Sequence, residues 1–211
     1  MSTDNFTFNL LTPTTFPDFE RLFAPVKGCG GCWCMYYRLD PKRWKKLQGD
    51  GCREAMRGLV ERGEAWGLLA YAEGEPVGWC TFGPRHHFPR LDRSKICQGL
   101  DNPDGLWSLP CFFIARPWRG KGLSRLLLAE ALAEMRKAKA RIVEAYPVTT
   151  TRDGRRVAAD FAWTGPLKIY EEAGFKAVRT VNPLRPVVRK VLGADDDYQP
   201  SVLPSSYSSE T

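Results

Sequence analysis

The chain has 211 residues, of which 43% are hydrophobic and 26% charged, a composition typical of a globular protein that buries a core. Its formal net charge is +7, but the basic residues are spread along the chain and accompany no recognisable nucleic-acid-binding motif. No run of about 18 apolar residues is present, so no membrane-spanning helix is predicted. Nucleic acid and membrane are therefore not the expected partners, and a basic surface would equally attract a phosphorylated ligand.

The first residues lack the basic segment and apolar block of a secretory signal peptide. The seven cysteines are an odd number without regular spacing, which is more typical of a reducing compartment than of a disulfide framework. We therefore expect a cytoplasmic protein. Cys29, Cys32 and Cys34 lie close enough in sequence to share zinc, but a closed site needs a fourth ligand from elsewhere. We interpret them as reduced thiols in a glycine-rich turn and assign no metal ligand.

Hydrophobic patterns predict the elements of the first half. Residues 6–11 alternate like a strand, and residues 12–15 can cap a helix that runs to about residue 22. Residues 28–34 form a turn, and residues 41–47 and 52–62 are predicted to be helices. Residues 66–72 and 76–82 form a hairpin, because Glu-Gly-Glu separates them. Residues 83–105 show no periodicity, and a loop of this length in a compact domain is more often functional than idle.

The second half begins with a strand over residues 107–115, in which Pro110 must occupy a bulge or an unpaired position. A helix with core spacing follows it, and residues 141–146 and 187–192 are predicted to be strands. Residues 165–178 form a short helix that ends at Gly174 and leads into a strand. Residues 147–164 form a second irregular stretch. From about residue 193 we expect a disordered tail, because apolar content falls there.

The segment 111–128 is the most informative part of the chain. A strand, a glycine turn and a helix in this order direct backbone N–H groups and a positive helix end at a phosphate. Gly120 and Gly122 let the main chain approach a ligand, and three cations accompany them. Neither the P-loop pattern nor the Rossmann pattern fits, because Gly122 is followed by leucine and serine and the third Rossmann glycine is missing.

Arg119, Gly122 and Ser124 instead match the pattern [QR]-x-x-G-x-[GA], with serine in place of glycine or alanine. This segment resembles motif A of the GNAT superfamily of acyl-CoA-dependent N-acetyltransferases. Tyr170, followed by Ala-Gly-Phe at residues 173–175, resembles motif B of the same superfamily. The resemblance extends from about residue 67 to residue 192 and is weak before that.

The resemblance implies an α/β fold with a mixed, twisted, mostly antiparallel sheet and helices on both faces. One GNAT domain would cover residues 1–192, with a cysteine-rich segment at 28–52, and residues 193–211 would form the tail. The main chain of three strand residues would bind the pantetheine arm of acetyl-CoA: Phe112, Phe113 and Ile114. The turn and the start of the helix would hold the pyrophosphate: Arg119, Gly120, Lys121, Gly122, Leu123, Ser124 and Arg125.

The resemblance also implies the chemistry. Tyr170 is the expected acid for the departing thiolate, because a phenol has a pKa of about 10 and a thiol about 8.5. An amine that is protonated at neutral pH needs a base or a water relay before it attacks, and Glu144 is the candidate. His86 and His87 are alternatives, and the family also tolerates having no dedicated base.

The activity implied is direct transfer of an acetyl group from acetyl-CoA to the amine of a small-molecule acceptor, which the two irregular stretches would enclose. Trp33, Tyr36 and Tyr37 would offer aromatic walls to that acceptor. Two alternatives stay open: a protein or peptide N-acetyltransferase, and a non-catalytic acyl-CoA or zinc sensor. A homodimer is one of the oligomeric states that the sequence allows.

Overall fold

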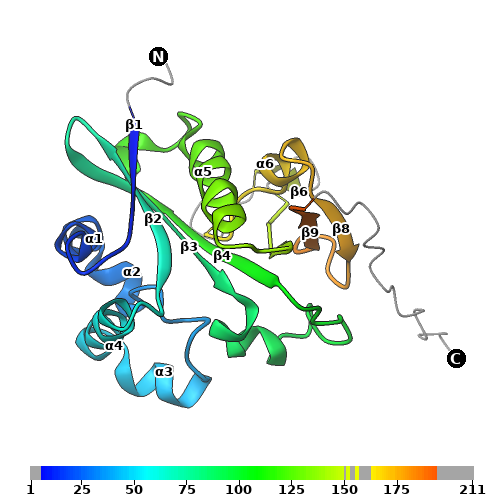
Figure 1. The fold of residues 1–211 in the computed structure, drawn as a ribbon, viewed down its shortest axis with the longest axis horizontal. Helices are drawn as coiled ribbons and strands as arrows, with labels where there is room; N and C mark the ends of the chain where they lie inside the picture. The colour runs from blue at the N-terminus through cyan, green and yellow to red at the C-terminus, as the bar shows by residue number, and fades with distance from the viewer. Residues whose placement is uncertain (1–5, 150, 153–154, 157–162, 194–211) are drawn as a thin grey trace, which may run out of the picture.

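The computed structural model describes residues 6–149, 151–152, 155–156 and 163–193 of the chain (Figure 1). The predicted tail lies outside these residues, apart from its first position. The longest helix in these ranges, α5 (Leu123–Lys137), has 15 residues. None of the helices described there combines the length and the apolar character needed to cross a membrane.

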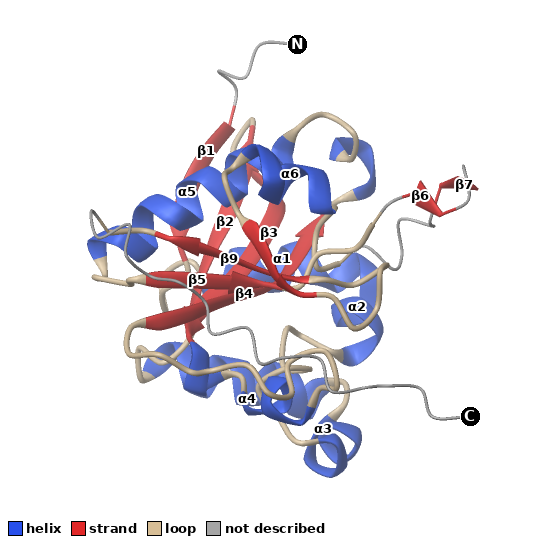
Figure 2. Ribbon diagram, turned by 90° about the vertical axis from the view of Figure 1, so that its right-hand side faces the viewer, coloured by secondary structure: helices blue, strands red, loops and turns tan. Residues whose placement is uncertain are grey.

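Seven strands form one sheet in the order β1-β2-β3-β4-β5-β9-β8. Neighbouring strands run antiparallel, except β4 and β5, which are parallel. Two very short strands pair with each other away from this sheet (Figure 2). The strands are β1 (Phe6–Leu10), β2 (Trp66–Ala72), β3 (Glu75–Pro84), β4 (Leu106–Ile114), β5 (Ile142–Ala145), β6 (Thr151–Arg152), β7 (Arg155–Arg156), β8 (Lys176–Arg179) and β9 (Val187–Val191).

The helices lie on both faces of this sheet, α5 and α6 on one face and α1 to α4 on the other (Figures 1 and 2). The mixed, mostly antiparallel α/β sheet predicted from the sequence is therefore confirmed. The α-helices are α1 (Phe16–Phe23), α2 (Lys27–Gly31), α3 (Pro41–Leu47), α4 (Asp50–Glu61), α5 (Leu123–Lys137) and α6 (Leu167–Glu172). Short 3₁₀ turns lie at Ala24–Val26, Arg85–His87, Pro89–Arg93 and Arg116–Trp118.

Side-chain alternation along the strands divides the core into two layers. On β4, Phe112 packs into the layer beneath α5, whereas Cys111 and Phe113 pack into the layer beneath α1 to α4. The α5 layer is closed by apolar side chains such as Leu127 and Leu132, which are at most 4% exposed. Each such leucine contributes about 1.5–3 kcal/mol through burial. These two layers hold β4 from both sides.

The predicted irregularity at Pro110 is confirmed as a bulge. The pairing of β3 with β4 moves from Thr81 opposite Cys111 to Gly83 opposite Ser108, so two β4 residues lie opposite one β3 residue. A proline fits there because it has no N–H to donate to the ladder.

The loop predicted at residues 83–105 is packed against the body of the protein. It contains two 3₁₀ turns, and Phe88, Leu91 and Cys97 form a small apolar cluster with Tyr146 and Val187. This cluster places the loop beside the ends of β5 and β9.

Candidate active site

The parallel strands β4 and β5 separate near the middle of the sheet. They pair from Leu106 opposite Ile142 to Leu109 opposite Ala145, where β5 ends. Strand β4 continues for five more residues, to Ile114. The far half of β4 therefore pairs with β3 on one side and presents main-chain groups to an opening on the other.

Two main-chain groups of β4 face this opening. The Phe112 N–H donates to the Trp163 carbonyl oxygen at 2.5 Å, and the Ile114 carbonyl accepts from Arg119 Nε at 2.9 Å. Because successive residues of a strand alternate, the main chain of Phe113 faces β3 instead. The structure thus presents two of the three predicted main-chain positions to the opening.

A short segment of the chain, residues 163–165, lies across the opening and is here called the strap. Its Gly165 carbonyl accepts from the Val148 N–H at 2.9 Å, and its Thr164 carbonyl accepts from the Tyr170 hydroxyl at 2.8 Å. The Tyr37 hydroxyl accepts a hydrogen bond from the Trp163 side chain. The Thr164 hydroxyl is buried and has no hydrogen-bond partner among the described residues. Hydrogen-bond donors from β4, from the loop after β5 and from α6 thus converge on the strap, beside an unsatisfied buried hydroxyl.

Tyr170, the predicted acid, lies on α6 and is fully buried. Its ring packs edge-on against Phe112 and Phe175, with centroid distances of 6.4 and 5.2 Å. Burial raises the pKa of Tyr170 well above its usual value, so the phenol keeps its proton at neutral pH. A protonated hydroxyl at the edge of the opening has the form that a proton donor requires.

The predicted phosphate cradle lies at the N-terminus of α5. Gly120 and Gly122 have φ of +75° and +83°, a left-handed conformation that glycine adopts without strain. A Cβ on either residue would meet no described atom within 4 Å, apart from adjoining residues. The first backbone bond accepted by Gly122 comes from the Arg125 N–H, at 2.9 Å. The N–H groups of Leu123 and Ser124 therefore precede the helical hydrogen-bond pattern and are available to an anion.

The cations of the cradle are exposed. Arg125 forms an ion pair with Glu172 of α6 at 2.5 Å, and Lys121 lies over the Trp118 ring, 4.6 Å from its centroid. The Leu123 side chain is buried in the α5 layer, so only its backbone can take part in binding.

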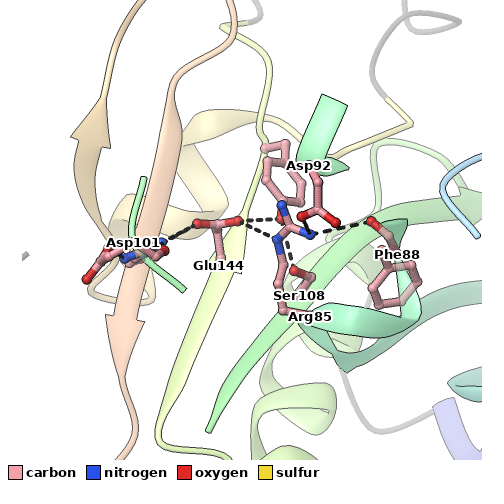
Figure 3. A network of polar contacts seen from close by, with 8 residues as sticks. Arg85, Phe88, Asp92, Asp101, Ser108 and Glu144 are labelled. Carbon is pink, nitrogen blue, oxygen red and sulfur yellow. Dashed lines mark hydrogen bonds and ion pairs between the residues drawn. The ribbon is translucent and has the colours of Figure 1, made fainter. Parts of the chain in front are cut away.

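Glu144, the candidate base, is almost completely buried on β5, where its carboxylate accepts several hydrogen bonds (Figure 3). Its Oε1 accepts from Arg85 Nε at 3.2 Å and from the Tyr146 hydroxyl at 2.5 Å. Its Oε2 accepts from Arg189 Nε at 2.9 Å. Ser108 lies 2.9 Å from the Tyr146 hydroxyl and extends the network to β4. Burial and the carboxylate raise the pKa of Tyr146 well above its usual value.

The outer ends of both arginines also have acidic partners. Arg85 Nη1 lies 2.8 Å from Asp92, and Arg189 Nη1 lies 2.5 Å from Asp101 (Figure 3). Both oxygens of Glu144 therefore neutralise buried guanidinium groups, an arrangement that favours a positioning role over proton abstraction. Its assignment as the base stays a prediction.

The alternative base, His87, lies in the first 3₁₀ turn of the 83–105 loop. Its ring packs edge-on against His86, with 4.6 Å between the centroids. Burial, with the nearby Arg38 charge, lowers the pKa of His87 to about 4. His87 is therefore neutral at pH 7, the form that accepts a proton, but it is a weak base.

The sequence did not point to the strap. Trp163 and Thr164 lie at the end of the irregular stretch 147–164, and the only local signal there is the Gly165-Pro166 pair before α6. Tyr37 was expected only as an aromatic wall. Cys34 of the glycine-rich turn packs in the layer on the opposite side of β4 from α5. In the ranges that the structure describes, no group of three or more Cys, His, Asp or Glu side chains has the arrangement needed to hold a metal ion.

The glycine turn that precedes α5 and the tyrosine on α6 lie on the elements that the GNAT resemblance implied, and β4 separates from β5 before that turn. The family model for "Acetyltransferase (GNAT) family" matches residues 33–162, which is more than half of the chain. The chain therefore belongs to the GNAT acetyltransferase family. None of the curated proteins matches this sequence.

Solved structures share the fold. An N-acetyltransferase from Staphylococcus aureus Mu50 is 14% identical, with a TM-score of 0.54, and the match covers 90% of this chain and 100% of that chain. PaiA N-acetyltransferase from Thermoplasma acidophilum, in complex with coenzyme A, is 14% identical, with a TM-score of 0.51 and coverage of 90% and 99%. Ribosomal-protein-S5-alanine acetyltransferase from Vibrio fischeri is 13% identical, with a TM-score of 0.51 and coverage of 95% and 98%.

Proposed function

We propose that this protein is an N-acetyltransferase that moves an acetyl group from acetyl-CoA directly to the amine of a small-molecule acceptor. The observation that carries the proposal is the opening of β4 away from β5 directly before the cradle. The main-chain groups of Phe112 and Ile114 face this opening, and the N-terminus of α5 lies next along the chain.

The residues present fit acetyl-CoA. Its phosphates would lie on the N–H groups of Leu123 and Ser124, where the positive end of the α5 dipole and the exposed cations favour an anion. Its pantetheine arm would pair with the main chain of Phe112 and Ile114, as an added strand pairs with a sheet edge. Acetyl-CoA supplies an activated acetyl group and a thiolate leaving group.

The donors that hold the strap define the reacting end of the site. The Phe112 N–H now donates to the Trp163 carbonyl, which stands in for the acyl oxygen that this N–H would polarise. Tyr170, which now donates to the Thr164 carbonyl, would donate its proton toward the departing sulfur. The strap must therefore shift when the acyl group enters.

Enclosure of the reacting end supports a small acceptor. Tyr170 and Thr164 are fully buried, and Phe112 is 6% exposed. Arg90 of the 83–105 loop lies 3.7 Å from the centroid of the Tyr36 ring, so this loop packs against the segment next to the cysteine-rich turn. A single amine fits such a space better than an extended peptide does, because a peptide needs an open groove.

Release of free CoA thiol tests the function. The protein is mixed with acetyl-CoA and either a panel of small amines or a panel of peptides that carry free N-termini and lysines. We expect release with at least one small amine. Release with peptides alone would replace the acceptor assignment, and CoA binding without release on either panel would favour a non-catalytic sensor.

The cradle has a matched pair of variants. Gly122→Ala and Gly63→Ala both place a Cβ on a residue with positive φ, and neither Cβ meets a described atom within 4 Å. Both should lose about 1–2 kcal/mol of stability, the cost of the left-handed conformation for an L-residue. Only Gly122→Ala should lose affinity for CoA in calorimetry, because Gly63 lies at the end of α4. Equal CoA affinity in both variants would contradict the cradle assignment.

A further inference from the structure

Two basic runs that lie far apart in sequence meet on one surface of the protein. One run is α3, and the other is the second 3₁₀ turn of the 83–105 loop with the residues that follow it. Arg90 joins them, because its guanidinium lies 3.7 Å from the centroid of the Tyr36 ring and 5.6 Å from that of Trp44 on α3. Its backbone N–H also donates to the Tyr37 carbonyl at 3.2 Å. The exposed cations of these two runs are here called the basic patch: Lys42, Arg43, Lys45, Lys46, Arg93 and Lys95.

The cations of the basic patch have no paired acids. Among the residues that the structure describes, no carboxylate lies within 4.0 Å of any of them. The acids of the same two runs are engaged elsewhere: Asp40 caps α3 by accepting from two backbone N–H groups, at 3.0 Å each, and Asp92 lies 2.8 Å from Arg85. By contrast, the exposed Arg62 and Arg125 pair with carboxylates at 3.0 and 2.5 Å. The patch therefore presents positive charge to the solvent without a paired anion.

The spacing of the cations on α3 brings them close to one another. Lys42 lies three residues before Lys45 and four before Lys46. Arg43 lies three residues before Lys46. Side chains at these spacings are neighbours on a helix surface, and like charges there disfavour the helix. A polyanion bound along this face would relieve the repulsion, so the helix is suited to such a ligand.

The patch offers charge but no apolar anchor. Trp44 and Leu47 of α3 are half-buried and pack against the layer beneath α1 to α4. In the described part of the chain, the exposed large apolar side chains lie outside the patch, at Val26, Trp163 and Val181. A peptide usually binds through a strand edge or an apolar groove, and a helix that lies on a membrane presents apolar side chains to the lipid. The composition of the patch favours neither partner.

Lysine predominates in the patch, where it supplies four of the six cations. A lysine ammonium binds phosphate as a point charge and does not require one particular geometry. A row of such charges suits a chain of phosphates, which repeats the same charge at each step without regard to base sequence.

We propose that the basic patch binds the phosphate backbone of a nucleic acid, independently of base sequence. Nucleic acid was not expected from the sequence, because the basic residues are spread along it, but the fold brings two of the basic runs together. Cations that contact phosphates release counterions, so binding weakens steeply as the salt concentration rises. Contact with about four to six phosphates of a duplex predicts a loss of affinity of about 10²–10³-fold between 50 and 200 mM salt. This binding does not depend on the proposed acetyl transfer.

Fluorescence anisotropy tests the binding without any activity measurement. The full chain is titrated into a labelled DNA duplex of about 20 base pairs, a labelled RNA strand of about 20 nucleotides and a labelled polyglutamate peptide, each over this range of salt. We expect at least one nucleic acid to bind with the steep salt dependence, and a difference between the two would identify the form that is bound. Failure of both nucleic acids to bind at low salt, or tighter binding of the peptide, would overturn the proposal.

Charge-reversed variants locate the binding surface. Lys42→Glu/Lys46→Glu should lower the affinity about tenfold or more and reduce the slope of log affinity against log salt by about 2. Arg136→Glu/Lys139→Glu is the matched control, because it makes the same change of charge at exposed residues by the C-terminus of α5, on the other face of the sheet. It should bind nearly as the wild type does. Equal losses in the two variants would show that only net charge matters and would overturn the proposal. If the reversal impairs folding, Lys42→Gln/Lys46→Gln removes the same two charges and should still reduce the slope by about 2.

The cradle also carries exposed cations and is the rival location for a nucleic acid. Arg116→Glu/Lys121→Glu makes the same change of charge there, and it should bind nucleic acid like the α5 control. A loss of affinity in this variant that equals or exceeds the loss in Lys42→Glu/Lys46→Glu would place the binding at the cradle and overturn its assignment to the basic patch.

Discussion

Replacement of Glu144 by glutamine separates the two roles open to this residue. Glutamine keeps the volume and one carbonyl oxygen but removes the negative charge. It would leave the guanidinium groups of Arg85 and Arg189 in a buried place without their shared anion, and would point an NH₂ group at one of them. The structure therefore predicts a large effect on stability.

The size of the effect follows from the burial of the network. The side chains of Glu144 and Arg189 are 2% and 3% exposed, and that of Arg85 is 8% exposed. Removal of one partner from a buried ion pair costs about 3–5 kcal/mol. In a domain of this size each kcal/mol shifts the melting temperature by about 2–4 °C. Glu144→Gln should therefore melt about 6–20 °C below the wild type.

Thermal unfolding followed by circular dichroism measures this shift. Asp92→Asn is the matched control, because it removes a carboxylate from the same Arg85 but at a side chain that is 60% exposed. An exposed ion pair contributes about 0–1 kcal/mol, so the control should melt within about 4 °C of the wild type.

The turnover of Glu144→Gln and its dependence on pH distinguish a positioning role from a role as the base. If Glu144 acts only by positioning, the rate of the folded variant should keep the pH profile of the wild type. One result would refute the structural reasoning and support the assignment of Glu144 as the base. In it, Glu144→Gln has the melting temperature of the wild type but loses turnover and shows an altered pH profile.

Three further predictions follow from the site. Tyr170→Phe should lower turnover on the order of 10²-fold while acetyl-CoA affinity changes little, and unaffected turnover would remove the proposed acid. The free energy of unfolding should fall as the pH drops from 6.5 toward 4. In this range His87 takes up a proton in the unfolded state, whereas in the folded state it does so only at about pH 4. His87→Gln should flatten that slope in urea unfolding, and an unchanged slope would exclude His87 as its source. Trp163→Ala removes the hydrogen bond to Tyr37 that holds the strap. Because the strap has to shift when the ligand enters, the variant should bind CoA about 2–10-fold more tightly in calorimetry. Weaker binding would show that the strap assists the ligand instead of competing with it.

Most of the fold could be predicted because it depends on local patterns. The strand at residues 66–72 and the helix at residues 41–47 were predicted with the bounds that the structure shows. The spacing of the hydrophobic residues predicts such elements. Pro110 predicts a bulge in its strand because a proline has no N–H to donate to the neighbouring strand. The glycine turn before α5 was also predictable, since its glycines are contiguous with the helix that they precede.

The rest of the site depends on contacts between distant parts of the chain. Glu144 looks like any strand carboxylate, and nothing nearby in sequence shows that Arg85 and Arg189, about 59 and 45 residues away, will enclose it. The position of the strap is of the same kind, because Phe112 and Trp163 are distant in sequence. Single-sequence patterns report which face a side chain occupies, but not which partner it meets there.

The division of β4 between two layers has a consequence for the Phe112 N–H. The Phe112 side chain is fixed in the α5 layer, while the side chains before and after it are fixed in the opposite layer. Rotation of this peptide plane would require both layers to repack together, which close-packed interiors resist. The direction of this N–H is therefore set before any ligand arrives. Because the N–H dipole is already oriented, little free energy is needed to reorient it when charge develops nearby. Its contribution to lowering the activation barrier is therefore established during folding.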